Sequence, residues 1–241
     1  MSERSGLGLL GDAEDVKNRP GLGAERGLSN AQLMADARMA LSGNWGMAVL
    51  GNVLYTLLIM SFSIFVGVAG LVVGVAGGAS GADIELAGGI VQIIANLGQL
   101  IIYGAVIVGF MGFFLGIAQE GDARLELLFV GFRRFWKSFG VYFFYTLFVY
   151  LWTSLFIIPG IIAAYRYMMA FFIIADDEDC GALEAISRSK AMMVGNKWKF
   201  FCLQWRFLGW GILCVMTFGI GFLWVIPYMQ TSFAKFYEDV K

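Results

Sequence analysis

The sequence predicts an all-α protein: a transmembrane helical bundle with about six membrane segments, short broken hairpins and amphipathic helices on the cytoplasmic side. Hydrophobic residues make up 59% of the chain and charged residues only 15%, against roughly 45–50% and about 25% in soluble domains. Residues 39–82 and 86–119 contain no Asp, Glu, Lys or Arg, and each stretch exceeds the roughly 20 residues of a spanning helix. We therefore expect one transmembrane domain over residues 29–241.

Composition also excludes several classes of function. Residues 1–28 mix glycine with charged residues and lack an apolar core, which predicts a disordered cytoplasmic tail. A formal net charge of −1 argues against nucleic acid as a partner. The chain has no histidine, and no carboxylate falls inside a predicted span, so we find no acid–base pair and expect a protein that is not an enzyme. No cofactor motif is recognisable.

The membrane domain begins with a short amphipathic helix. Ser29 and Gln32 have the spacing of a capping box, which predicts a helix start, and Leu33, Ala37 and Leu41 then share one face of a helix that ends near Gly43. The first span runs from about residue 47 into a glycine-rich stretch at 67–78. There Gly70, Gly74 and Gly78 recur every four residues, a spacing that lets another helix approach closely.

A regular polar stripe marks the second span, at about residues 89–117. Its four polar side chains follow at steps of four, three and four, so they project from one helical face. The stripe is explained either by hydrogen bonds between helices or by the lining of a polar path. Gly112 and Gly116 offer a further close-packing pair. The stripe consists of Gln92, Asn96, Gln99 and Tyr103.

Two broken hairpins are expected in the second half of the chain. A third span at 138–158 is stopped by Pro159 and Gly160, because proline lacks a donor and glycine disfavours helix. The return leg at 161–175 measures about 23 Å, less than the roughly 30 Å hydrocarbon core. A second hairpin pairs residues 200–216 with 222–234. The basic connection at 120–137 is predicted to lie in the interface as an amphipathic helix.

Lys and Arg counts set the orientation of the spans. The 78–88 loop has none, whereas the region up to Arg38 has five, the 120–137 connection four and residues 188–199 four. These three basic segments belong on the cytoplasmic side. We therefore expect a multi-pass protein of the plasma membrane with both termini in the cytoplasm.

Arginines within apolar sequence are the strongest candidates for binding. Arg166 lies in the return leg and Arg206 about 10 Å into the next span by helical rise, and an intramembrane charge costs at least about 2.5 kcal/mol unless it finds a partner or a wet route. Both residues can reach the interface or hydrogen-bond internally. Alternatively, they bind an anion such as a lipid phosphate, which guanidinium contacts in bidentate fashion.

An acidic cluster and a basic helix follow the return leg. The carboxylates at 176–179 could hold Mg²⁺ or Ca²⁺, but they precede a helix at 182–194, where acids stabilise the N-terminal dipole. We favour this structural role and predict no metal site. Lys190 projects from the apolar face of that helix and is expected either to extend beside lipid headgroups or to contribute to the binding site.

Five segments resemble the bacterial integral membrane family called domain of unknown function 975. They are ALSGNWGMAV at 40–49, LFVGFRRF at 128–135, LFIIPGIIAAYRYMMAFFIIAD at 155–176, EAISRSKAMMVGNKWKFF at 184–201 and GIGFLWVIPYMQTSFAKFYEDVK at 219–241. This resemblance implies a polytopic protein of the bacterial plasma membrane. The Pro-Gly leg and the EAISRSK helix also resemble, more remotely, the membrane domain attached to some glycerophosphodiester phosphodiesterases.

Two functions remain open from the sequence. The first is a non-catalytic membrane module that binds anionic lipid, through Arg166, Arg206 and Lys190, or a membrane partner, including a second copy, through the glycine faces. The second is a transporter or channel for a small solute or lipid, with a path lined by Gln92, Asn96, Gln99 and both arginines. Broken helices at membrane depth are typical of such transporters. A continuous wet cavity would distinguish the two.

Overall fold

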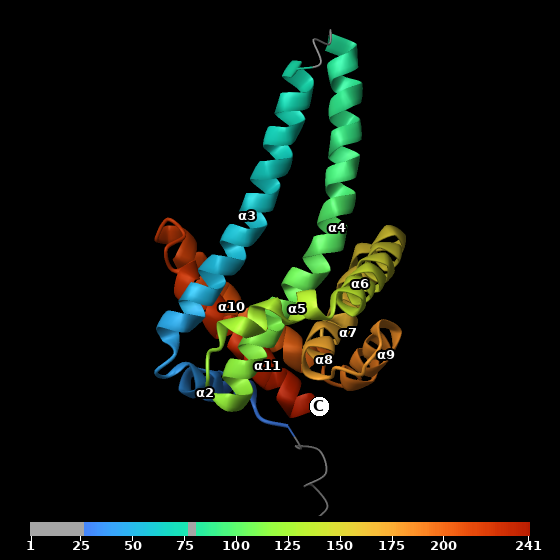
Figure 1. Cartoon of the computed structure of the whole chain (residues 1–241). Coiled ribbons are helices and arrows are strands. Elements are labelled where there is room, and N and C mark those ends of the chain that lie inside the picture. The colour runs from blue at the N-terminus through green and yellow to red at the C-terminus, as the bar shows by residue number, and fades with distance from the viewer. Residues whose placement is uncertain (1–26, 77–80) are drawn as a thin grey trace, which may run out of the picture.

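The computed structural model describes residues 27–76 and 81–241, and these form an all-α fold (Figure 1). Apart from its last two residues, the predicted tail at 1–28 lies outside the described part, as do Gly77 and Gly78. Leu28 is held in place, since its amide donates to Asp239 Oδ1 at 2.6 Å.

The first described helix confirms the expected capping box. In α2 (Asn30–Leu41) the Ser29 side chain accepts from the Gln32 amide at 3.3 Å, and the Gln32 side chain accepts from the Ser29 amide at 2.8 Å. The predicted apolar face, Leu33, Ala37 and Leu41, is fully buried. The residues that follow α2 turn with Gly43 at a φ of +88°, a conformation that glycine adopts without strain.

Two long helices form an antiparallel hairpin that extends beyond the other helices (Figure 1). They are α3 (Trp45–Ala76) and α4 (Gly81–Glu120), of 32 and 40 residues, or about 48 and 60 Å. The C-terminal half of α4 is the centre of the fold and contacts α6, α8 and α11. Most of its side chains from 104 to 118 are buried, whereas the outer faces of α3 carry exposed Leu, Ile and Phe side chains typical of a lipid-facing surface.

The connection after α4 differs from the predicted amphipathic helix. It divides into the 3₁₀-helix η1 (Leu125–Phe129) and the four-residue α5 (Val130–Arg133). The reason is backbone packing: a Cβ added at Gly131 would lie 1.8 Å from the carbonyl oxygen of Ala105, and one at Gly109 would lie 1.9 Å from that of Leu128. The segment is therefore pressed against α4, where one straight helix would not fit.

The first broken hairpin bends three residues earlier than expected. Helix α6 (Phe135–Leu155) ends before Phe156, and α7 (Ile157–Tyr167) starts directly after it. A continued helix would place the ring of Pro159 against the carbonyl of Leu155, so α6 stops there, and Pro159 and Gly160 enter the first turn of α7. Gly160 lets α7 approach α6, because an added Cβ would lie 2.1 Å from Thr153 Oγ1.

The early bend also lengthens the return leg. After a turn at Met168 and Met169, α8 (Ala170–Asp176) continues from α7, so the leg covers Ile157–Asp176 and 20 residues. This length is sufficient to cross a bilayer. The expected shortfall at residues 161–175 was therefore wrong, because it rested on a bend at Pro159.

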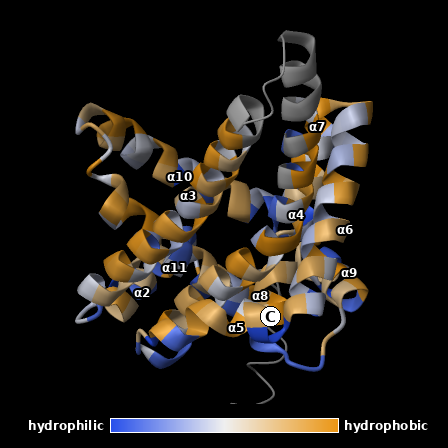
Figure 2. Cartoon of the chain, turned by 45° about the horizontal axis from the view of Figure 1, so that its top comes forward, coloured by the Kyte–Doolittle hydropathy of each residue, from blue (hydrophilic) through white to orange (hydrophobic). Residues whose placement is uncertain are grey.

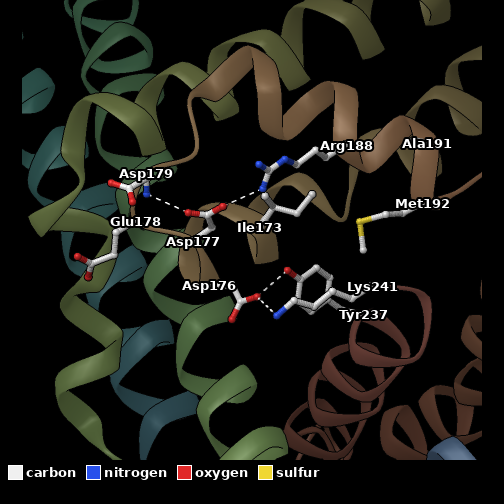
Figure 3. A pocket seen from close by; sticks show the side chains of 10 residues that line it. All are labelled: Ile173, Asp176, Asp177, Glu178, Asp179, Arg188, Ala191, Met192, Tyr237 and Lys241. Atoms are coloured by element: carbon white, nitrogen blue, oxygen red, sulfur yellow. Dashed lines mark hydrogen bonds and ion pairs between the residues drawn. The ribbon is translucent and has the colours of Figure 1, made fainter.

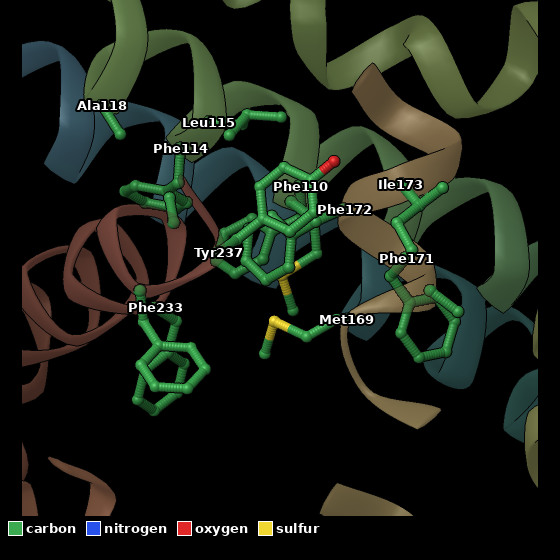
Figure 4. Close-up of a cluster of buried hydrophobic side chains, with 14 of the residues drawn as sticks. Phe110, Phe114, Leu115, Ala118, Met169, Phe171, Phe172, Ile173, Phe233 and Tyr237 are labelled. Carbon is green, nitrogen blue, oxygen red and sulfur yellow. The ribbon is translucent and has the colours of Figure 1, made fainter. Parts of the chain in front are cut away.

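The rest of the chain surrounds the inner end of α4. It consists of α9 (Ala182–Met192), α10 (Lys197–Met216) and α11 (Phe222–Val240). Figure 4 shows the resulting core, where aromatic side chains of α4, α8 and α11 meet. Phe172 stacks on Tyr237 with centroids 5.5 Å apart. Between α10 and α11 the chain reverses at Phe218 and Gly219, with φ of 53° and 85°.

Among the described residues, four segments are long and apolar enough to cross a membrane: Trp45–Val72, Gln92–Glu120, Phe135–Leu155 and Ile157–Asp176. The protein is therefore a multi-pass membrane protein. Figure 2 shows hydrophilic residues concentrated around the C-terminus and α5, toward the bottom of the view.

Candidate functional site

The charged end of the molecule contains a cavity of about 770 Å³ between α8, α9 and the end of α11 (Figure 3). Asp176 forms part of the wall of this cavity. Its carboxylate accepts from Tyr237 Oη at 2.9 Å, from Lys241 Nζ at 2.5 Å and from Gln119 Nε2 at 3.2 Å. These bonds join α4, α8 and α11, so Asp176 has a structural role in connecting three helices.

Asp177 organises the turn from α8 to α9. Its carboxylate pairs with Arg188 at 2.8 Å and also accepts from the amides of Asp179 and Cys180 at 3.0 and 3.3 Å. The Arg188 guanidinium, and next the two amides, hold the pKa of Asp177 below its ordinary value. The residue at the N-cap of α9 is Gly181, so Asp177 stabilises the turn before the helix and does not cap the helix itself.

Acidification is expected to loosen this turn. Because the pKa of Asp177 is lower in the folded protein, its contribution is fully present above the unfolded pKa of about 3.9 and disappears as the pH falls below it. Hydrogen exchange of the Asp179 and Cys180 amides should therefore accelerate below about pH 4 relative to amides of α6. Asp177→Asn keeps an acceptor oxygen but should remove the pH dependence. An identical pH profile in that variant would contradict this role.

The acidic cluster does not converge as a metal site would. Glu178 points to Arg134 at 2.5 Å, while Asp176 and Asp177 are engaged as described. Among the residues that the structure describes, no group of three or more His, Cys, Asp or Glu side chains could hold a metal ion. Hydrogen bonds and ion pairs within the protein therefore account for Asp176, Asp177 and Glu178.

Arg166 lies near the end of α7, against α9. Ser189 Oγ of α9 donates to the Arg166 carbonyl oxygen at 2.9 Å, and the neighbouring Tyr165 contacts Phe200 and Phe201 of α10. The Arg166 side chain is half-buried, and its Nε is a buried atom with no hydrogen-bond partner in the described part of the chain. Such a donor is costly unless something accepts from it.

The other two predicted cations lie on neighbouring helices. Lys190 follows Ser189 on α9 and is exposed; Arg206 is exposed on α10, about one and a half turns beyond Phe201. Within the described residues, the ion pairs involve other side chains than Arg166, Lys190 and Arg206. The fold thus brings the helices of all three cations together, and direct contacts join α9 and α10 to the segment around Arg166.

The polar stripe lies at a different place, on α4. Gln92 and Asn96 are exposed and bonded to each other at 3.0 Å, Gln99 is half-buried, and Tyr103 contacts Tyr142 of α6 with ring centroids 6.1 Å apart. The arginines lie on α7 and α10, while the stripe follows α4.

Comparison with known proteins finds a family match for the C-terminal part of the chain. The model of a family described as "Protein of unknown function (DUF975)" matches residues 154–241. This segment is a DUF975 domain. The DUF975 domain comprises α7 to α11 and so includes Pro159, Gly160 and all three candidate cations, whereas the stripe on α4 precedes it. Searches of curated proteins and of solved structures gave no match.

Sequence reasoning missed the polar side chains inside the bundle. Asn52 on α3 is 3% exposed, and the Oε1 atom of Gln230 on α11 is buried without a hydrogen-bond partner among the described residues. Asn52 stands alone in an apolar stretch and Gln230 directly precedes Thr231 and Ser232, so neither belongs to a periodic pattern of polar residues. Their relation to one another depends on the tertiary fold.

Proposed function

We propose that this protein is a non-catalytic module of the bacterial plasma membrane that binds the phosphate of an anionic lipid, with Arg166 as the principal residue. The observation that carries the proposal is the buried, unpartnered Nε of Arg166 in a membrane segment. A phosphate oxygen can accept from Nε and a second from a neighbouring guanidinium nitrogen, the bidentate arrangement that arginine favours.

The position of Arg166 relative to α9 supports an inner-leaflet headgroup. Helix α9 carries Glu184 and Arg188 as an exposed ion pair, as expected for a helix beside water, and its Ser189 bonds to the Arg166 carbonyl. This bond fixes the backbone at Arg166 against α9, a helix that we expect to lie beside the headgroups of the inner leaflet. Lys190 on the same helix, and Arg206 on α10, add positive charge that favours anionic lipid.

This proposal includes a specific topology. We place α10 and α11 in the membrane as a second hairpin, which makes six membrane segments, with both termini and α9 on the cytoplasmic side. The clustering of Asp176, Glu178, Lys199 and Asp239 at the end that carries the C-terminus supports this orientation, since charged groups avoid the hydrocarbon core.

Self-association through glycine faces receives less support. Gly112 and Gly116 already serve packing within the chain, because Cβ atoms added there would lie 3.3 Å from the Ala175 side chain and 2.3 Å from that of Leu127. A membrane partner would have to use another surface, such as the exposed apolar side of α3.

Transport is the second candidate function. Tyr103, the last residue of the stripe, contacts Tyr142 and so connects the stripe to the interior between α4 and α6. This contact favours a path along Gln92, Asn96 and Gln99. The arginines lie away from that line of residues, on α7 and α10. For this reason we favour lipid binding, with a solute or lipid path along the stripe as the alternative.

Lipid co-purification provides the test. Arg166→Gln should lower the amount of anionic phospholipid per protein about tenfold or more, since a lost charge-assisted contact is worth roughly 1.5–3 kcal/mol. Mass spectrometry of protein extracted in mild detergent gives the measurement. Arg124→Gln is the matched control, because Arg124 pairs with Glu120 on the exposed surface. Lys190→Gln and Arg206→Gln should have smaller effects.

The proposal fails if Arg166→Gln elutes as a folded, monodisperse protein with unchanged lipid content. Labelling of single cysteines at positions 96 and 99 by a water-soluble thiol reagent would instead support the path on α4. Labelling of a cysteine at position 160 from the outside only would agree with the six-segment topology.

A further inference from the structure

A second cavity lies between the candidate membrane-spanning segments and α11. It has a volume of about 380 Å³, within the range of small-molecule sites. Residues of α3, α4, α6, α8 and α11 form its wall, together with Met168 of the turn before α8. The apolar lining is Ile107, Phe110, Met111, Met168, Phe171, Ile226 and Met229, and the polar lining is Asn52, Tyr55, Thr56, Tyr142, Tyr145 and Gln230.

The polar groups of this cavity are held in place but have few partners. Asn52 is 3% exposed, and the buried Oε1 of Gln230 has no hydrogen-bond partner among the described residues. Tyr55 stacks on Phe110 with centroids 3.9 Å apart, and Tyr145 contacts Phe171 edge to face at 5.0 Å. Figure 4 shows both phenylalanines in the adjoining core.

A buried amide oxygen without a partner is costly inside a membrane protein, and this cost at Gln230 points to a ligand. A buried amide without partners loses its hydrogen bonds to water and gains nothing in return. Asn52 and Gln230 come from α3 and α11, distant in sequence, yet both line the same cavity. Aromatic contacts fix the tyrosines beside them, so the polar groups form a preorganised set of donors and acceptors.

The depth of the cavity indicates that the ligand comes from the bilayer. Asn52 lies seven residues along α3 from Trp45, and Phe110 lies ten residues before the end of α4 at Glu120, which correspond to about 10 and 15 Å of helix. The hydrocarbon core is about 30 Å thick. At the rim, Thr56 is exposed beside Leu57 on the outer surface of α3.

The absence of charge in the lining defines the class of ligand. All residues around the cavity are uncharged, so an ionised headgroup would enter without a counter-charge, at high cost. We propose that the cavity binds a neutral amphipathic lipid whose hydroxyl or amide headgroup hydrogen-bonds to Asn52 and Gln230, while its chain lies against the methionines and phenylalanines. This site is separate from the anionic site at Arg166.

A photoreactive neutral lipid tests the proposal. The probe is a monoacylglycerol with a diazirine on its chain, added to the full protein in phospholipid nanodiscs. We expect saturable crosslinking that maps by mass spectrometry to cavity residues and is competed by unlabelled monoacylglycerol, but not by phosphatidic acid or glycerol. Asn52→Leu should lower crosslinking about tenfold, the effect of losing one to two hydrogen bonds.

The same variant separates binding from structure. Leucine has the same number of side-chain heavy atoms and the same branching as asparagine and replaces a buried amide with an apolar group, so Asn52→Leu should unfold at a higher temperature than the wild type while it binds less probe. Gln230→Leu should also bind less probe, and it replaces Asn52→Leu as the test variant if the latter expresses poorly. Arg166→Gln should leave the crosslinking unchanged.

Three results would overturn the proposal: crosslinks that map outside the cavity, equal crosslinking in folded Asn52→Leu and Gln230→Leu, or full competition by glycerol, which would indicate a water-soluble ligand. Competition by phosphatidic acid together with loss of labelling in Arg166→Gln would assign the probe to the Arg166 site instead. Failure of the lipid retention test at Arg166 leaves this inference unaffected, because the two readouts use different lipids and different variants.

Discussion

Gly131→Ala is expected to lower the free energy of unfolding by at least about 3 kcal/mol, at or beyond the upper end of overpacking effects. The new Cβ would lie 1.8 Å from the carbonyl oxygen of Ala105, and a backbone atom of a buried helix cannot move aside as a flexible side chain can. The Gly131 carbonyl also accepts from Ser138 Oγ at 3.0 Å in the buried interior. Displacing α5 would break this bond as well.

Thermal unfolding in detergent and the fraction of monodisperse protein measure the effect. Gly109→Ala should match it, because its Cβ would lie 1.9 Å from the Leu128 carbonyl oxygen on the other side of the same contact. Gly46→Ala is the control: nothing lies within 4 Å of a Cβ at this helical position, so alanine should be neutral or slightly stabilising. Equal unfolding temperatures for all three variants would refute the packing argument.

Arg134→Met is expected to destabilise the protein by about 2–4 kcal/mol through lost charge-assisted hydrogen bonds. Arg134 Nη1 donates to the carbonyl oxygens of Ile174 and Ala175 at 2.6 and 3.0 Å, and Nη2 pairs with Glu178 at 2.5 Å. The two carbonyls belong to the last turn of α8, which has no further helical residues to satisfy them. Without Arg134, the buried end of α8 loses its donors.

Glu178→Gln separates the carbonyl contacts from the ion pair. The Arg134 side chain is only 14% exposed, whereas that of Glu178 is 74% exposed, and a solvent-exposed partner contributes little. We therefore expect a nearly unchanged unfolding temperature for Glu178→Gln and a large decrease for Arg134→Met. Similar decreases in both variants would mean that the ion pair, and not the capping of α8, stabilises this region.

Local signals predicted several helices well. The capping box at Ser29 and the apolar face of α2 depend on residues three or four positions apart, and long uncharged stretches suffice to indicate α3 and α4. The helix at 182–194 was also expected, within two residues of the observed α9. In each case the determining interactions lie within one or two helical turns.

Predictions failed where a distant segment decides the local conformation. The connection at 120–137 has the composition of an amphipathic helix, but its backbone meets that of α4 at Gly131 and Gly109. We predicted the bend of the first hairpin at Pro159 itself. The ring of a proline within a helix conflicts with the carbonyl group four residues earlier, here that of Leu155, so the helix ends there. Gly112 and Gly116, which could have faced a partner, pack within the chain.

By itself, the sequence determined that this is an all-α multi-pass membrane protein, because uncharged length and helical periodicity are local properties with a direct physical cause in the bilayer. It also identified Arg166 as anomalous, since a charge in an apolar segment is visible without a structure. Only the tertiary structure decided which polar groups meet. Asn52 and Gln230 are 178 positions apart and converge because α3 and α11 both pack near α4, and the cost of burying these polar side chains becomes evident only in that arrangement.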